Sequence, residues 1–147
     1  MRSLKVLHIE DREDDAVLFC RACEAAGLPA RFCRVKDGSE AVSYLTGAGE
    51  FRDRSKFPLP DLIVLDLQMP GMGGFDFMKW LRSESALGAL PVLVFTVSDN
   101  AEDKARALAE GAAGYFTKPK DFETLVKLAE SFRQFSGDGE DKNKEVT

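Results

Sequence analysis

Polar side chains follow four short apolar runs of this sequence. Glu10 and Asp11 come directly after the first run, and Asp66 closes the second. Thr96 and Lys118 end two later runs. Short apolar runs of this kind are typical of buried β-strands. Three carboxylates, a hydroxyl and an ammonium that all stand at strand ends indicate one common site.

The chemistry that these side chains favour is phosphoryl transfer. Carboxylates packed as closely as Glu10, Asp11 and Asp66 repel one another, so the group is expected to hold a hard divalent cation, most simply Mg²⁺. Beside Mg²⁺, the Lys118 ammonium would neutralise phosphoryl oxygens and the Thr96 hydroxyl would donate a hydrogen bond to one of them. Asp66 can then act as a nucleophile and form an acyl phosphate.

Strand and helix patterns alternate along the chain, and this alternation predicts how the five residues are positioned. Five strand–helix units indicate an α/β fold, a doubly wound five-stranded parallel sheet with helices on both faces. In a sheet of order 2-1-3-4-5, ligands lie beyond the carboxyl ends of strands one and three. We therefore expect all five residues in one cleft. The predicted strands are 4–9, 31–35, 61–65, 91–95 and 113–117, and the predicted helices are 14–26, 39–45, 74–83, one opening at 99–102 and one beginning near 121.

The helices show expected caps and apolar faces. Ser39 is expected to cap the second helix, and residues 99–102 form a capping box for the fourth. The apolar stripes predicted from helical spacing are Ala101, Ala105, Leu108 and Ala112 in the fourth helix, and Phe122, Leu125, Ala129 and Phe132 in the last.

Composition narrows the functional classes. The chain has 147 residues, of which 44% are hydrophobic, and this fits one domain with a buried core. A net charge of -5 argues against binding to DNA. No apolar stretch approaches the roughly 20 residues of a membrane span, and the N-terminus lacks a signal peptide. We therefore expect a cytoplasmic protein that binds neither DNA nor membranes.

The three cysteines do not form a disulfide framework, because their number is odd. Cys20 and Cys23 lie on the first predicted helix, together with the apolar Ala16 and Phe19. We interpret them as small buried side chains, since zinc would require further ligands. The single histidine, His8, is expected to be a partly buried strand residue.

Two segments stand outside the regular pattern. The connection from Thr46 to Pro60 is long for such a fold, and it is either a functional loop or a tolerated surface excursion. Residues 136–147 are polar and are expected to be a disordered tail. Residues 3–135 are therefore predicted to form the folded domain.

Over about Ser3 to Phe135 the chain resembles the receiver domains of bacterial two-component response regulators. The resemblance rests on motifs that are specific in combination. They are the Glu10-Asp11 pair, Asp66 followed by Met69-Pro70-Gly71-Met72 and Gly74, Thr96, and Gly111-Ala112 leading to Tyr115 and Lys118-Pro119.

The resemblance implies a role for each of these residues. Asp66 would be the phosphoacceptor for a histidine of a sensor kinase, which makes the chain a signalling domain rather than a turnover enzyme. Asp11, Asp66 and the backbone carbonyl of Gln68 would ligate Mg²⁺, and Glu10 would act mainly through water. Thr96 and Tyr115 would form a switch pair that repacks the face of helix four, strand five and helix five. The Lys118-Pro119 bond would be cis and would aim the ammonium into the site.

The long loop resembles one subfamily, the stand-alone regulators paired with bacterial and cyanobacterial phytochromes. The partner kinase would then be a bacteriophytochrome, and two copies would pair through the helix-four and helix-five surfaces. A downstream protein target or a phosphotransfer protein would receive the signal. Some positions depart from the common pattern of the family: Arg12 replaces a small polar residue, and Val97 stands where residues are usually small. By the same resemblance, Gln68 and Ser98 would occupy the variable positions that tune dephosphorylation in the family.

Three alternatives use part of the same pattern. A hydrolase of the haloacid dehalogenase type also has an aspartate nucleophile, but it normally carries a second aspartate where this chain has Gln68. A flavodoxin-like module needs a hydroxyl- and glycine-rich phosphate loop, where this chain has the acidic stretch 10–15. A receiver-like domain that is not phosphorylated would not need the intact set of five residues.

Overall fold

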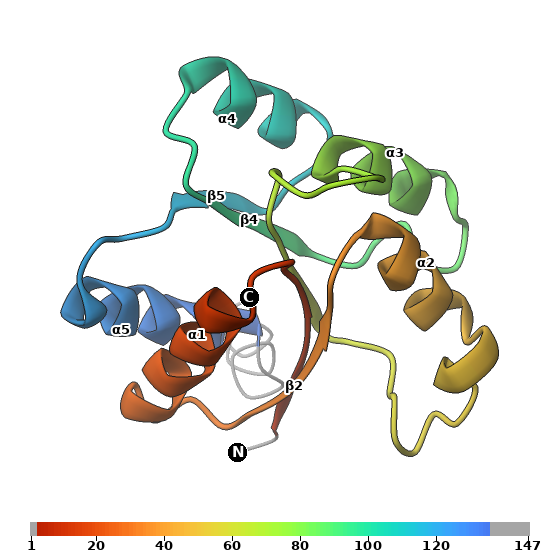
Figure 1. The fold of residues 1–147 in the computed structure, drawn as a ribbon, viewed down its shortest axis with the longest axis horizontal. Coiled ribbons are helices and arrows are strands. Elements are labelled where there is room, and N and C mark those ends of the chain that lie inside the picture. Colours follow the sequence, from red (N-terminus) through yellow and green to blue (C-terminus); the bar gives the residue numbers. More distant parts are fainter. Residues whose placement is uncertain (1–2, 136–147) are drawn as a thin grey trace, which may run out of the picture.

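The computed structural model describes residues 3–135, which form a five-stranded parallel sheet in the order β2-β1-β3-β4-β5 (Figure 1). The predicted fold and strand order are confirmed. The predicted tail at 136–147 lies outside the described residues. The strands are β1 (Leu4–Ile9), β2 (Ala30–Val35), β3 (Leu62–Leu65), β4 (Val92–Thr96) and β5 (Gly114–Thr117), and the helices are α1 (Glu13–Ala25), α2 (Gly38–Thr46), α3 (Gly74–Ser83), α4 (Ala101–Ala109) and α5 (Phe122–Ser131), with short 3₁₀ turns at Gly49–Phe51 and Phe132–Phe135.

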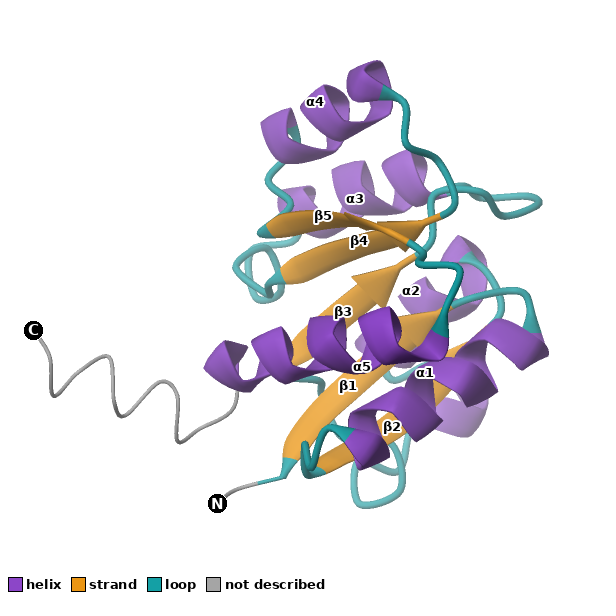
Figure 2. Cartoon of the chain, turned by 90° about the vertical axis from the view of Figure 1, so that its left-hand side faces the viewer, coloured by secondary structure: helices purple, strands orange, loops and turns teal. Residues whose placement is uncertain are grey.

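Two apolar cores lie on opposite faces of the sheet. Because successive strand residues point to opposite faces, Leu7 and Ile9 of β1 join one core, and Leu4 and Val6 join the other. The first core packs against α2 and α3, and the second lies under α1 and α5 (Figure 2). Every residue of β3 is buried, as expected for a central parallel strand. Helices therefore cover both faces of the sheet, and the loops lie at its two ends.

The helix caps differ from the prediction by one or two residues. Asp37 rather than Ser39 is the N-cap of α2, and its carboxylate accepts the Glu40 N–H at 2.8 Å. Asn100 is the N-cap of α4 and accepts the Glu102 N–H at 2.7 Å. The observed caps are an aspartate and an asparagine, which are among the residues that best satisfy a free helix N–H.

The predicted apolar face of α4 is wrong. Ala107 is the buried residue of this helix, whereas Leu108 is 45% exposed, and Ala101 and Ala105 are exposed as well. Alanines occur on several sides of α4, so its sequence does not define a unique apolar face. The helix lies beyond the β5 edge of the sheet (Figure 2), and little of its surface is covered.

The predicted face of α5 is correct apart from its first residue. Leu125, Ala129 and Phe132 are buried against the sheet, but Phe122 is 43% exposed. Phe122 begins the helix, where the chain has just left the β5 edge.

The long connection between α2 and β3 is packed by its own side chains. Phe51, Phe57 and Tyr44 pack together with tilted and edge-to-face rings, whose centroids lie 5.1 to 6.0 Å apart. Arg54 donates to the carbonyl oxygens of Tyr44, Leu45 and Phe57 at 2.8 to 3.1 Å. Because the segment leads into the amino end of β3, it lies at the end of the sheet opposite to the carboxyl edge.

Two cysteines lie on α1, and the third lies on β2. Cys23 is buried, Cys20 and Cys33 are half-buried, and all three are free thiols. Within residues 3–135, the Cys, His, Asp and Glu groups able to hold a metal ion do not include a cysteine. No helix in the same range is both long and apolar enough to cross a bilayer.

Candidate functional site

The register of the central strands places the acidic residues side by side. Ile9 pairs with Leu65, so Glu10 and Asp66 are the next residues along β1 and β3. The Asp66 N–H donates to the Ile9 carbonyl at 3.1 Å, and the Glu10 N–H donates to the Val35 carbonyl at 2.9 Å. Both backbones therefore stay in the sheet ladder up to the point where their carboxylates enter the site.

Three carboxylates gather at this edge. Glu10, Asp11 and Asp66 each offer an oxygen, and these oxygens lie within 4.8 Å of one another. Glu10 is fully buried, Asp66 is 4% exposed, and Asp11 is exposed. Hard oxygen ligands at this spacing, with one side open to solvent, fit a divalent cation that keeps several waters.

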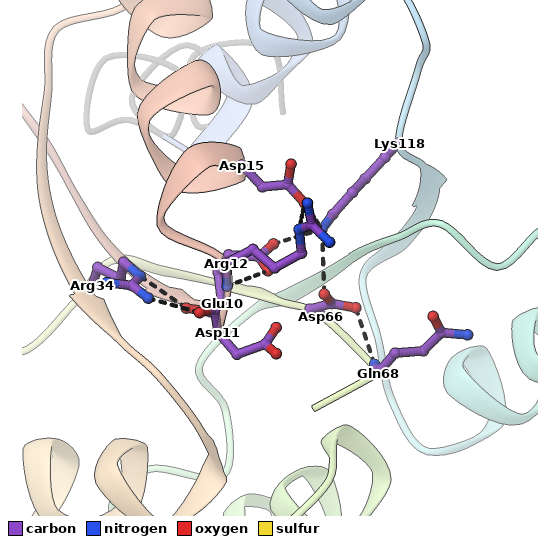
Figure 3. A network of polar contacts seen from close by, with 8 residues as sticks. All are labelled: Glu10, Asp11, Arg12, Asp15, Arg34, Asp66, Gln68 and Lys118. Carbon is purple, nitrogen blue, oxygen red and sulfur yellow. Dashed lines mark hydrogen bonds and ion pairs between the residues drawn. The ribbon is translucent and has the colours of Figure 1, made fainter. Parts of the chain in front are cut away.

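Lys118 joins the same group through its ammonium. Its Nζ donates to Glu10 Oε1 at 2.6 Å, to Asp15 Oδ2 at 2.8 Å and to Asp66 Oδ2 at 3.2 Å (Figure 3). The contact between Lys118 and Asp66 agrees with the predicted cleft, whereas Asp15 was not among the predicted site residues. Only part of the signal was present in the sequence: a helix that follows a strand begins at the same edge of the sheet, but the sequence does not tell which residue of its first turn faces the site.

Burial and charge shift the pKa values of this group. Burial raises the pKa of Glu10 to about 7, although the hydrogen bond and charge of Lys118 act in the opposite direction. Burial alone lowers the pKa of Lys118, but the hydrogen bonds to Asp15 and Glu10 and the charge of Asp66 raise it overall above its ordinary value. Lys118 is therefore a fixed cation at the site.

Backbone contacts hold the surrounding loops. The Gln68 N–H donates to Asp66 Oδ1 at 3.0 Å, and the Gln68 side chain points away from the carboxylates (Figure 3). Arg34 donates to the carbonyl oxygens of Glu10 and Asp11 at 2.8 and 3.0 Å. At Gly74, a Cβ would lie only 2.9 Å from the Leu67 Cα, so glycine allows α3 to begin against the backbone that follows Asp66.

The hydroxyl groups of Thr96 and Tyr115 do not take part in the hydrogen bonds around Lys118. Thr96 is fully buried at the end of β4, and its Oγ1 has no hydrogen-bond partner. The Tyr115 hydroxyl donates to the Ser98 carbonyl at 2.9 Å. A buried hydroxyl without a partner is costly, so Thr96 has an unused donor at the edge where the site lies.

The peptide bond between Lys118 and Pro119 is trans, so the expectation of a cis bond is wrong. The Lys118 N–H donates to the Thr96 carbonyl at 2.7 Å, which continues the pairing of β4 with β5 for one residue. From this position the Lys118 side chain reaches the carboxylates with a trans bond.

Arg12 and Val97 both lie at the solvent side. The Arg12 side chain is 68% exposed, and its Nε lies 3.6 Å from Asp15 Oδ2. Val97 is 59% exposed, directly after the buried Thr96. Neither side chain is packed into the core.

His8 is more deeply buried than predicted. It is 2% exposed on β1, its Nδ1 has no hydrogen-bond partner, and its ring lies 4.9 Å from that of Phe19. Burial, followed by the charges of Lys118 and Arg34, lowers its pKa to about 3. Within the folded domain His8 is therefore a neutral core residue.

We expect His8 to make the domain less stable as the pH falls. The unfolded chain takes up a proton on His8 near its ordinary pKa of about 6.5, whereas the folded chain does so only near 3, so the stability present above 6.5 is lost between these values. The loss is up to about 1.4 kcal/mol per pH unit.

Glu10 titrates in the opposite sense, because its pKa is raised. The measurement is therefore the difference in free energy of unfolding in urea between wild type and His8→Phe. That difference should shift in favour of the variant by about 2 kcal/mol between about pH 7.5 and 5. A constant difference would contradict the neutral state of His8.

Comparison with known proteins identifies similar chains. Residues 6–130 match the family model described as the response regulator receiver domain. FilR2, a probable methanogenesis regulatory protein of Methanothrix harundinacea, is 30% identical over 130 residues, which are 88% of this chain and 81% of FilR2.

Two solved structures share the fold. Phosphorylated RcpA, a cyanobacterial phytochrome response regulator, aligns with a TM-score of 0.80 and 28% identity, over 91% of this chain and 94% of RcpA. The Mn(2+)-bound form of Rcp1, a response regulator of Synechocystis sp., aligns with a TM-score of 0.77 and 26% identity, over 90% of this chain and 93% of Rcp1.

Proposed function

This chain belongs to the response regulator receiver domain family, and from that premise we propose that it accepts a phosphoryl group on Asp66 from a sensor histidine kinase. The observation that carries the proposal is the Lys118 ammonium, which hydrogen-bonds Asp66 beside an acidic group of metal-binding geometry. A cation and a metal site around one nearly buried carboxylate are the parts that phosphoryl transfer requires.

The reaction that we propose is a direct displacement at phosphorus. An oxygen of Asp66 attacks the phosphorus, and the bond from phosphorus to the donor's histidine nitrogen breaks as the acyl phosphate forms. Glu10, Asp11, Asp66 and the Gln68 carbonyl would hold Mg²⁺, which supplies charge neutralisation for the transferring oxygens when bound. Lys118 neutralises a further phosphoryl oxygen, and the unused hydroxyl of Thr96 donates a hydrogen bond to it.

The signal would leave through the face made by α4, β5 and α5. When the Thr96 hydroxyl turns to the phosphoryl group, Tyr115 exchanges its bond with the Ser98 carbonyl for an inward position. The sparse burial of α4 supports this step, because only a small apolar contact must be broken for the helix to shift.

The partners follow from the same proposal. The donor is a sensor histidine kinase, and the similarity to RcpA, a phytochrome response regulator, favours a kinase of phytochrome type. The recipient is a protein target or a phosphotransfer protein rather than DNA or a membrane. We place the protein in the cytoplasm and propose that two copies pair through α4 and α5, where Leu108 and Phe122 are exposed. A light-scattering mass of one protomer throughout the micromolar range would contradict the pairing.

The experiment that tests the proposed function is incubation with acetyl phosphate or phosphoramidate. Intact-mass spectrometry should show one added phosphoryl group in millimolar Mg²⁺ and none in excess EDTA. A mass that does not change in either solution with any donor would contradict the proposal. Steady release of phosphate from an ordinary phosphate ester would instead favour the hydrolase.

We expect Mg²⁺ to stabilise the unphosphorylated domain, because it relieves the repulsion among Glu10, Asp11 and Asp66. At a concentration ten times its dissociation constant, the gain in free energy of unfolding is about 1.4 kcal/mol. Thermal melts in Mg²⁺ and in EDTA at equal ionic strength measure it. Asp11→Asn is the matched variant, since Asp11 belongs to the acidic group without bonding Lys118, and it should lose most of the gain. Equal melting temperatures for wild type in both solutions would argue against a metal site.

Thr96→Val should separate stability from signalling. Since the Thr96 hydroxyl has no partner, exchanging it for a methyl group should leave the unphosphorylated domain equally stable, or more stable by about 1 kcal/mol. The phosphorylated variant, however, should lose the change in hydrogen exchange across α4 and β5 that wild type shows. Thr46→Val, which makes the same exchange at the exposed end of α2, is the control. The assignment fails if Thr96→Val keeps that change in full.

A further inference from the structure

We propose that Asp15 is a positioning residue that holds the Lys118 ammonium toward Asp66. This role rests on the proposed phosphorylation of Asp66 and adds to it a residue from outside the strand ends. Asp15 belongs to the first turn of α1, and its carboxylate lies on the opposite side of Lys118 Nζ from the loop that carries Gln68 (Figure 3).

The hydrogen bonds of Lys118 show how the ammonium is held. An ammonium has three N–H donors, and here three carboxylates accept from it. The two short contacts, at 2.6 and 2.8 Å, come from Glu10 and Asp15, and the longest, at 3.2 Å, goes to Asp66. Two anchors thus orient the ammonium and direct its remaining donor to the reacting carboxylate.

Asp15 differs from the other two acceptors in what happens to it during the reaction. Asp66 becomes an acyl phosphate, and Glu10 belongs to the acidic group that would surround the metal. Asp15 neither reacts nor belongs to that group, so it can keep its bond to Lys118 before and after phosphorylation. It is therefore the anchor of Lys118 that the chemistry leaves unchanged.

The position of Asp15 is itself well fixed. The next residue, Ala16, is buried, and Phe19 one turn later is fully buried in the core under α1. Arg12 lies on the solvent side, with its Nε 3.6 Å from the Asp15 carboxylate. Asp15 thus links the exposed cation of Arg12 to the buried cation of Lys118, whose side chain is 10% exposed.

Without Asp15 the ammonium loses one of its two anchors. Lysine has a flexible four-carbon stem, so the group would sample other orientations, and its alignment with the phosphoryl oxygens would have to be restored in each reaction. We expect the phosphorylation rate of Asp15→Ala, extrapolated to saturating acetyl phosphate, to fall about tenfold. Asp15→Asn retains an acceptor oxygen at the same place and should stay within about threefold of wild type.

The experiment compares four proteins in saturating Mg²⁺: wild type, Asp15→Ala, Asp15→Asn and Asp14→Ala. Asp14 is an exposed acid on the same turn, so its variant makes the same change in net charge and should keep the wild-type rate. Equal rates for Asp15→Ala and Asp14→Ala would overturn the proposal. An Asn variant as slow as the Ala variant would also overturn it, since charge rather than position would then be the cause.

A second readout does not require phosphorylation. In spectra of ¹⁵N-labelled lysine side chains, the buried Lys118 ammonium should give a slowly exchanging signal, assigned by its loss in Lys118→Met. The signal should survive in Asp14→Ala and disappear in Asp15→Ala, and its persistence in Asp15→Ala would overturn the anchoring. A wild-type chain that accepts no phosphoryl group would overturn the proposed function, and with it the role of Asp15. Normal phosphorylation of both wild type and Asp15→Ala would overturn the role of Asp15 alone.

Discussion

Asp66→Asn will abolish phosphorylation by acetyl phosphate and by a histidine kinase. The neutral amide is a far weaker nucleophile than the carboxylate, so no acyl phosphate forms at this position. The fold should survive, because the amide oxygen can still accept the hydrogen bond of Lys118 and one of the repelling charges is removed. Mg²⁺ should stabilise the variant much less than wild type, because an anionic ligand has been lost. Intact-mass spectrometry and thermal melts measure both effects.

The matched control for this variant is Asp14→Asn, which makes the same exchange at an exposed position of α1. It should be phosphorylated at the wild-type rate and respond normally to Mg²⁺. Continued phosphorylation of Asp66→Asn would show that another residue is the acceptor, and the assignment of the site would then be wrong.

Lys118→Met will both destabilise the domain and slow phosphorylation. Removing the ammonium leaves Glu10, Asp15 and Asp66 uncompensated in a site where Glu10 and Asp66 are almost wholly buried. Breaking a buried ion pair from one side costs about 3–5 kcal/mol, and methionine fills the same volume, so little of the loss would come from a cavity. Mg²⁺ should restore part of the stability, because it supplies positive charge to the same carboxylates.

The same substitution should lower the phosphorylation rate by about a hundredfold, since one preorganised charge for the phosphoryl oxygens is missing. Urea unfolding with and without Mg²⁺, together with the rate in acetyl phosphate, measures both effects. Lys120→Met, at an exposed lysine two residues later, should change neither. A Lys118→Met protein as stable as wild type would mean that the three contacts of the ammonium contribute nothing.

Much of the site could be predicted because parallel strands have a strict geometry. The carboxyl ends of β1 and β3 meet at one edge, so Glu10, Asp11 and Asp66 had to be neighbours once the strand order was known. The alternation of strands and helices predicts a doubly wound parallel sheet, and 2-1-3-4-5 is one of the two common strand orders of such sheets. The position of Asp15 could not be predicted in this way, because Asp15 lies on a helix. Helical spacing alone does not tell which residue of the first turn faces the edge of the sheet.

Where the prediction failed, the sequence pattern was ambiguous or the family pattern did not apply. The alanines of α4 favour several faces equally, and the position of the helix beside β5 decides that Ala107 is the buried one. The cis bond at Lys118-Pro119 was inferred from resemblance alone, and the trans chain reaches the site without it. The burial of His8 depends on the packing of Phe19 above β1, which spacing along the chain does not specify.

The central claim is that Asp66 carries the phosphoryl group, and reduction by borohydride tests it most directly. Hydride reduces an acyl phosphate to an alcohol with loss of phosphate, so a phosphorylated aspartate becomes homoserine. After incubation with acetyl phosphate and Mg²⁺, reduction and peptide mass mapping should find homoserine at position 66. Homoserine at Asp11, Asp15 or any other carboxylate instead, or an unmodified Asp66 in a chain that has gained a phosphoryl group, would contradict the account.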